Sequence, residues 1–172
     1  DKLQSIYIPQ HVTRIDDYAF LNNYALKNLT FAARSKLEHI GYNAFINAIS
    51  LESVSIPDSV TYVQSLAFQN CANMIYFKMG ASMSKRFFSP MYVGKNSNWA
   101  SFKNWEKIRT FIVGDSVDEI PDYTFAGLNT LEHLSFGKKV KNIKKAFYTK
   151  KVVIDAFGRK ILTIVPNSMV LK

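Results

Sequence analysis

The sequence has few of the residues that build catalytic, metal-binding or cross-linked sites. It holds one cysteine, Cys71, among 172 residues, so no intrachain disulfide can form. With only 7 glycines it has no glycine-rich phosphate loop, and its three histidines show no metal-ligand spacing. No apolar run approaches the ~20 residues that a membrane span requires. We therefore expect no cofactor, no metal, no catalytic centre and no membrane span.

An internal repeat runs through most of the chain. Its first copy is Leu3-x-x-Ile6-x-Ile8-Pro9-x-x-Val12-x-x-Ile15-x-x-x-Ala19-Phe20, and its third is Leu51-x-x-Val54-x-Ile56-Pro57-x-x-Val60-x-x-Val63-x-x-x-Ala67-Phe68. Equivalent strand positions are 23, 25, 23, 34 and 23 residues apart, at Ile6, Leu29, Val54, Phe77, Phe111 and Leu134. The fourth unit, residues 74–107, is degenerate and carries an expansion of 11 residues. Periods of this length are typical of solenoids.

Each repeat predicts a short strand followed by a turn. In Leu-x-x-Ile-x-Ile the last two apolar residues are separated by one residue. In a strand both therefore point to the same side, toward the inside of the coil. The proline after them ends the strand, because it has no backbone N–H for the ladder. Alanine beside phenylalanine lets the chain turn tightly while the ring fills the coil. One coil cannot bury its own apolar face, so we expect parallel coils stacked around a shared core.

The stretch from Leu51 to Cys71, with Pro57-Asp58-Ser59-Val60-Thr61 after its strand, resembles the BspA-type leucine-rich repeat, common in bacterial surface proteins. The match covers roughly residues 3–147, with unit four degenerate. It implies a right-handed leucine-rich-repeat solenoid, a β-rich α/β fold of short parallel strands, turns and short helical segments. It also implies export to the cell surface and a role in adhesion or protein binding.

Residues 148–172 no longer fit the repeat. The segments 152–154 and 161–165 predict two strands joined by a turn at Phe157-Gly158-Arg159. Because a solenoid needs an atypical unit to cover its last coil, we expect a solenoid over residues 1–147 and a C-terminal β cap over 148–172. The alternative is that more repeats follow in a longer protein.

Unit four loses the Ala-Phe pair and gains a run of aromatic residues. Trp99, Phe102 and Trp105 recur every three residues, which predicts one stripe of a short helix. Such a stripe usually faces inward, where the rings would replace the missing phenylalanine in the core. The alternative is an exposed aromatic platform for a sugar or a protein.

The outward residues of the stacked strands form two rows, which together are the candidate binding face. Their small, polar and aromatic side chains suit adaptable recognition, although strand propensity alone accounts for some of them. The first row is Ser5, Asn28, Ser53, Tyr76, Thr110 and His133, and the second is Tyr7, Thr30, Ser55, Lys78, Ile112 and Ser135.

The net charge of +9 is concentrated near the C-terminus. Residues 138–160 hold 9 Lys and Arg against one acidic residue, Asp155. This end of the chain is either a patch that attracts a polyanion or a solvated end of the solenoid. No nucleic-acid-binding motif accompanies the charge. The candidate basic patch consists of Lys138, Lys139, Lys141, Lys144, Lys145, Lys150 and Lys151.

These features favour a binding module over an enzyme, since no set of titratable groups is placed to converge in a pocket. We expect protein–protein interaction or adhesion through the strand face, with a protein or glycan of a host or neighbouring cell as the partner and no nucleic acid. The alternative is binding of an anionic glycan or other polyanion by the basic end. The chain opens on Asp1-Lys2-Leu3, which is no secretion signal. The resemblance implies a secreted or bacterial cell-surface protein, and we expect this chain to be either a trimmed mature form or an excised fragment of it, without the export signal.

Overall fold

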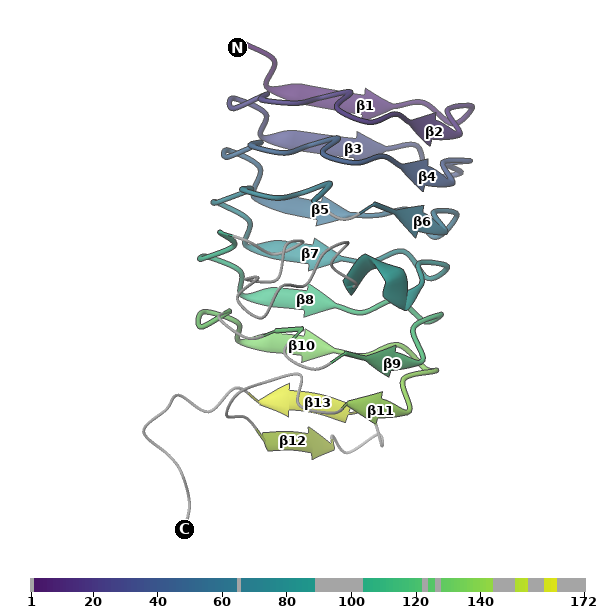
Figure 1. The fold of residues 1–172 in the computed structure, drawn as a ribbon, viewed down its shortest axis with the longest axis vertical. Coiled ribbons are helices and arrows are strands. Elements are labelled where there is room, and N and C mark those ends of the chain that lie inside the picture. The colour runs from purple at the N-terminus through teal and green to yellow at the C-terminus, as the bar shows by residue number, and fades with distance from the viewer. Residues whose placement is uncertain are drawn as a thin grey trace.

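The computed structural model shows a stack of similar coils along one axis (Figure 1). It describes residues 2–64, 66–88, 104–121, 124–125 and 128–143, together with the backbone of two strands at 151–154 and 160–163. Each coil lies on the next at the period found in the sequence. The predicted leucine-rich-repeat solenoid is therefore confirmed.

One long sheet runs down the side of the stack, and each of its first six strands opens one coil, so the coils are numbered one to six. The six strands are β1 (Ser5–Ile8), β3 (Asn28–Phe31), β5 (Ser53–Ser55), β7 (Tyr76–Lys78), β8 (Thr110–Ile112) and β10 (His133–Ser135). All six are parallel, as coils wound in one direction require. Ile6 pairs with Leu29 and Phe77 pairs with Phe111, so the positions inferred to be equivalent are adjacent in the sheet.

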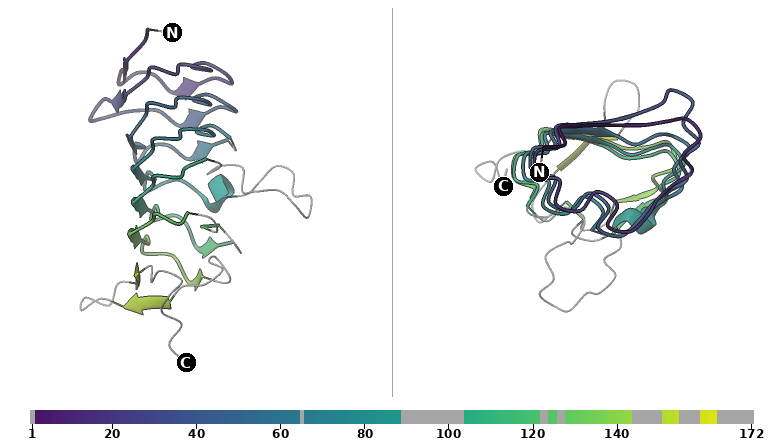
Figure 2. Two further views of the ribbon diagram at one scale, coloured as in Figure 1. Left: turned by 90° about the vertical axis from the view of Figure 1, so that its left-hand side faces the viewer. Right: turned by 90° about the horizontal axis from the view of Figure 1, so that it is seen from above.

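A second line of very short strands closes each coil on another side. It comprises β2 (Arg14–Ile15), β4 (His39–Ile40) and β6 (Tyr62–Val63) in one sheet, and β9 (Glu119–Ile120) and β11 (Asn142–Ile143) in another. In coil four the 3₁₀-helix η1 (Lys85–Phe88) lies between the two sheets and contacts both β6 and β9. Viewed from above, the coils superimpose around one interior (Figure 2).

The core consists of the inward side chains of every coil. Phe20, Phe45 and Phe68 stack on one another, with ring centroids 5.1 Å apart at each step and nearly parallel planes. The alanines before Phe45 and Phe68 are also buried, which leaves room for the tight turn. Cys71 is fully buried as well, and burial raises the pKa of its thiol. The thiol is therefore held in its unreactive protonated form.

An asparagine ladder that the sequence analysis missed holds the turns after the phenylalanines together. Asn22, Asn47, Asn70 and Asn104 all have positive φ, between 61° and 66°. Asparagine adopts this left-handed conformation at lower cost than most residues. Each side-chain amide donates to the amide oxygen of the asparagine in the preceding coil, with N···O distances of 2.7 Å at every step. Figure 2 shows the turns lying above one another.

The expanded unit four rejoins the stack at this ladder. Asn104 has a φ of 66°, so a regular helix does not extend to Trp105, which corrects that part of the sequence prediction. Trp105 is 1% exposed, and its Nε1 donates a hydrogen bond to the Phe68 carbonyl at 2.9 Å. Trp105 is thus a core residue and offers no exposed ring. Trp99 and Phe102 lie outside the described residues.

The two strands expected near the C-terminus are present as β12 (Lys151–Ile154) and β13 (Lys160–Thr163). They form an antiparallel hairpin. β13 also pairs antiparallel with β10, through Leu134 and Leu162 among others, so the hairpin extends the main sheet after coil six. The division into a solenoid over 1–147 and a cap over 148–172 stays a prediction.

Candidate binding face

The two outward rows of the main sheet lie in the register expected from the sequence. Strand pairing places Ser5 beside Asn28, Asn28 beside Ser53, and so on to His133 in coil six. It likewise places Tyr7 beside Thr30 and Lys78 beside Ile112. We call these two rows the strand face. The first row is thus paired at every step, and the second row is paired at every step except the one between Thr30 and Ser55.

Exposure varies along the strand face. Tyr7 is 62% exposed, which leaves a large aromatic surface open in coil one. In coils four and five the row residues are half-buried: Tyr76, Lys78, Thr110 and Ile112. The remaining members are exposed. A bound partner would therefore meet hydroxyl, amide and aromatic groups along the six coils.

Hydrogen bonds between neighbouring coils hold some of these side chains in place. The Asn28 amide nitrogen donates to the Ser5 hydroxyl at 3.1 Å. The Thr30 hydroxyl donates to the Ile6 carbonyl at 3.3 Å. Such contacts reduce the conformational entropy that binding would otherwise have to overcome.

The titratable side chains of the strand face are Tyr7, Tyr76, Lys78 and His133. Its two rows contain no carboxylate, and within the described residues no group of three or more His, Cys, Asp or Glu side chains is placed to hold a metal ion. No helix in the part of the chain that the structure describes is long and apolar enough to cross a membrane.

Ionisable groups gather instead around the second line of strands. On β4, His39 contacts the Tyr62 ring with centroids 5.1 Å apart, and its buried Nε2 atom has no hydrogen-bond partner among the described residues. Burial, followed by the positive charge of Arg14, lowers the pKa of His39, although Asp17 and Asp16 act in the opposite direction. His39 therefore favours its neutral form.

Along the same line of short strands, a lysine of coil four forms ion pairs with two acidic residues of coil five. Lys85 Nζ lies 3.3 Å from Asp118 and 3.4 Å from Glu119. Hydrogen bonding to Asp118 raises the pKa of Lys85, and the same contact lowers the pKa of Asp118. Because these groups are exposed, such pairs add little to stability.

The basic patch is described only in part. Lys138, Lys139 and Lys141 are exposed. The Lys138 backbone N–H donates to Asp115 Oδ1 at 3.1 Å, and its Nζ lies 3.9 Å from Asp115 Oδ2. Lys144, Lys145 and Lys150 lie outside the described residues, as does the side chain of Lys151. The structure therefore shows three exposed lysines near one carboxylate.

The sequence profile of the "BspA type Leucine rich repeat region" matches this chain over residues 1–91 and 94–167, with six copies. The chain belongs to this family. The match includes the coils that pair in register in the main sheet. No curated protein matches the chain.

Solved leucine-rich-repeat structures share the fold at low sequence identity. A leucine-rich repeat protein of Treponema pallidum is 16% identical with a TM-score of 0.56, and the match covers 82% of this chain and 79% of that one. A leucine rich cell surface protein of Faecalibacterium prausnitzii is 20% identical with a TM-score of 0.52, covering 95% of this chain and 46% of that one. A leucine-rich repeat protein of Bacteroides ovatus is 12% identical with a TM-score of 0.52; the match covers 86% of this chain and 30% of that protein.

Proposed function

We propose that this chain is a non-catalytic binding module of a secreted or bacterial cell-surface protein, and that its strand face binds a partner protein. The observation that carries the proposal is the alignment of twelve outward side chains over six coils. Aligned rows of this kind form the extended surfaces that solenoid proteins use for binding. Tyrosine, serine and asparagine in these rows provide aromatic contact area and adaptable hydrogen bonds.

Family membership supports the surface location. The neighbour from Faecalibacterium prausnitzii is described as a cell surface protein. We take the partner to be a protein exposed on a host or neighbouring cell.

Replacement of Tyr7 tests this proposal. Tyr7→Ala removes the most exposed aromatic side chain of the strand face without opening the core. We expect the affinity for a partner found on an array of extracellular proteins to fall by about 1–3 kcal/mol, because exposed tyrosines often dominate such interfaces. Tyr76→Ala should act in the same direction.

Tyr24→Ala is the matched control, because Tyr24 is 42% exposed but lies outside both rows. Surface plasmon resonance on all three variants would measure the change in Kd. Equal loss of affinity in Tyr24→Ala and Tyr7→Ala would contradict binding by the strand face.

Binding of an anionic glycan by the basic end is the second candidate function. The exposed lysines Lys138, Lys139 and Lys141 favour it. Binding by this patch would weaken steeply as salt is raised, because exposed charges are screened. Salt-resistant binding that depends on Tyr7 would instead support the strand face.

A further inference from the structure

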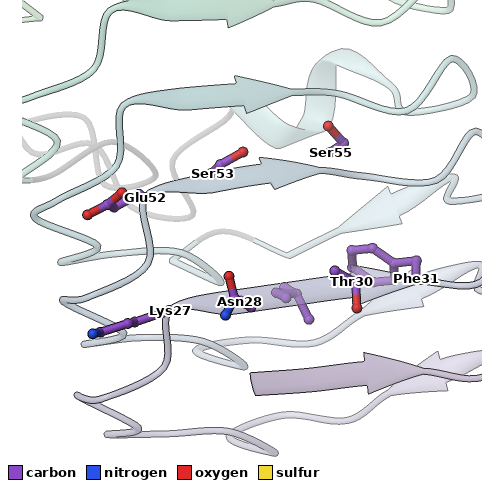
Figure 3. Close-up of a pocket in the computed structure, with 8 residues that line it drawn as sticks. Lys27, Asn28, Thr30, Phe31, Glu52, Ser53 and Ser55 are labelled. Carbon is purple, nitrogen blue, oxygen red and sulfur yellow. The ribbon is translucent and has the colours of Figure 1, made fainter. Parts of the chain in front are cut away.

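The main sheet is loosely joined at one place, between coils two and three. β1 and β3 pair at four positions, whereas β3 and β5 pair at one, Asn28 with Ser53. Further along coils two and three, the next contact is a hydrogen bond from the Ser59 hydroxyl to the Leu37 carbonyl at 2.7 Å. Between these points lies a groove of about 590 Å³, which we call the seam (Figure 3).

The length of coil two explains the seam. The step from Leu29 to Val54 is 25 residues, while the steps on either side of it are 23. The extra residues fall after Phe31, where the chain passes through the exposed Ala33 and Arg34. The Ala32 and Lys36 N–H groups remain bonded to coil one, and the Ile56 N–H bonds to coil four. The longer turn therefore separates β3 from β5 beyond the Asn28–Ser53 pair, while the other sides of coils two and three stay joined.

Phe31 is left partly uncovered by this separation. It occupies an inward row whose other members in coils one, three, four and five are at most 5% exposed. Phe31 is instead half-buried and lines both the seam and a smaller hollow of about 310 Å³ beside it. An aromatic ring is thus accessible inside a groove rather than sealed in the core. The buried residues of this inward row in coils one, three, four and five are Ile8, Ile56, Met79 and Val113.

The rest of the lining offers hydrogen-bonding groups. Because its amide nitrogen donates to Ser5 in coil one, Asn28 presents its oxygen toward β5 (Figure 3). The hydroxyls of Ser53 and Ser55 stand on the opposite strand (Figure 3). The groove therefore combines an apolar ring with an amide and two hydroxyls, in a volume within the range of small-ligand sites.

Charge in and beside the seam is balanced. Lys27 and Glu52 line one end, and Asp58 and Lys78 line the adjoining hollow. Two positive and two negative side chains leave no net attraction for an ion of either sign. The occupant that fits is an uncharged ligand with both hydroxyl groups and an apolar face, and a pyranose ring has both.

We propose that the seam binds one or two pyranose units of an uncharged glycan. The apolar face of one sugar ring packs on Phe31, and the sugar hydroxyls bond to Asn28, Ser53 and Ser55. This site goes beyond the proposed protein-binding function. Asn28, Thr30, Ser53 and Ser55 belong to both the strand face and the seam. The two proposals are still separable, because Tyr7 belongs only to the strand face and Phe31 only to the seam.

Filling the groove is the sharpest test. Ser55→Phe adds a ring from an exposed position on β5 and leaves the core unchanged. Ser135→Phe is the matched control, since Ser135 is the exposed residue of the same row in coil six. The probe is an array of uncharged di- and trisaccharides, with isothermal titration calorimetry on the hits. We expect Ser55→Phe to weaken binding by about tenfold or more, while Ser135→Phe leaves the Kd unchanged.

Phe31→Ala should weaken binding to a similar extent, and Phe136→Ala, which removes a half-buried ring from the same inward row, should not. Circular dichroism of each variant checks that it is folded. If Phe31→Ala fails to fold, Ser55→Phe still decides the question. Binding insensitive to Ser55→Phe, binding only to acidic glycans, or no bound uncharged sugar would each overturn the proposal.

Discussion

At the scale of single residues, the phenylalanine after each alanine is central to stability. Phe68 is 1% exposed and packs between the stacked ring of Phe45 and the edge of Phe77. Its carbonyl also accepts the Trp105 indole hydrogen bond. The ring therefore joins coil three to the coils on both sides.

Phe68→Ala should lower the free energy of unfolding by about 3–5 kcal/mol, because it creates a cavity in a close-packed core. Urea titration followed by circular dichroism would measure the change. Phe20→Ala is the control: Phe20 stacks on Phe45 only and is half-buried, so its loss should cost less. A cost below ~1 kcal/mol for Phe68→Ala would be inconsistent with its central position.

Residue spacing alone predicted which side chains face inward, because the strand period of two leaves no other arrangement for Leu-x-x-Ile-x-Ile. It did not predict the exposure of Phe31. That exposure depends on how two extra residues are accommodated, and a length difference does not say which neighbouring coil will separate. Burial of Trp105 was one of two possibilities, and its hydrogen bond to the Phe68 carbonyl shows why the ring lies inside.

At the scale of elements, the asparagine ladder fixes the turns as the sheets fix the strands. Asn70 donates to Asn47 and accepts from Asn104, and it has a φ of 61°. Each of these features contributes separately to stability. Two substitutions at this position can separate them.

Asn70→Gly should cost about 1–3 kcal/mol, since it removes one partly buried and one exposed hydrogen bond and keeps the left-handed backbone accessible. Asn70→Ala should cost about 1–2 kcal/mol more, because alanine also disfavours positive φ. Thermal and urea melts would measure both. Asn73→Ala is the control, since the Asn73 side chain accepts an exposed hydrogen bond from Lys107 and is not part of the ladder. A ladder that contributes nothing would leave Asn70→Gly as stable as the parent.

The ladder has a signature in the sequence. Asparagine follows the phenylalanine by two residues at Asn22, Asn47 and Asn70. Phe102 and Asn104 repeat this spacing, 34 residues after Phe68 and Asn70. The three-residue recurrence of aromatic residues also fits a helix, so the two patterns compete over this segment. A fixed interval to the previous coil is the stronger signal, because each coil must match its neighbour's turn.

At the scale of the whole molecule, the solenoid depends on contacts between adjacent coils, so an uncovered end is its weak point. β13 covers β10 through three residue pairs, including His133 with Thr163. Without that cover, β10 would present a free strand edge, and Leu134, now 1% exposed, would lose protection. Free edges of this kind pair with other chains.

Truncation after Ile143 removes β12 and β13 and tests whether they act as the cap predicted for residues 148–172. We expect a lower urea midpoint and association that increases with concentration, because the exposed β10 edge offers unpaired N–H and C=O groups to a second copy. Analytical ultracentrifugation at several concentrations would detect the oligomers. Adding His133→Lys and Ser135→Lys to the truncated chain should reduce the association, since charges along a strand edge oppose pairing. If the truncated chain stays monomeric and keeps the parental midpoint, the hairpin is not a cap, and coil six is stable at the end of the stack without it.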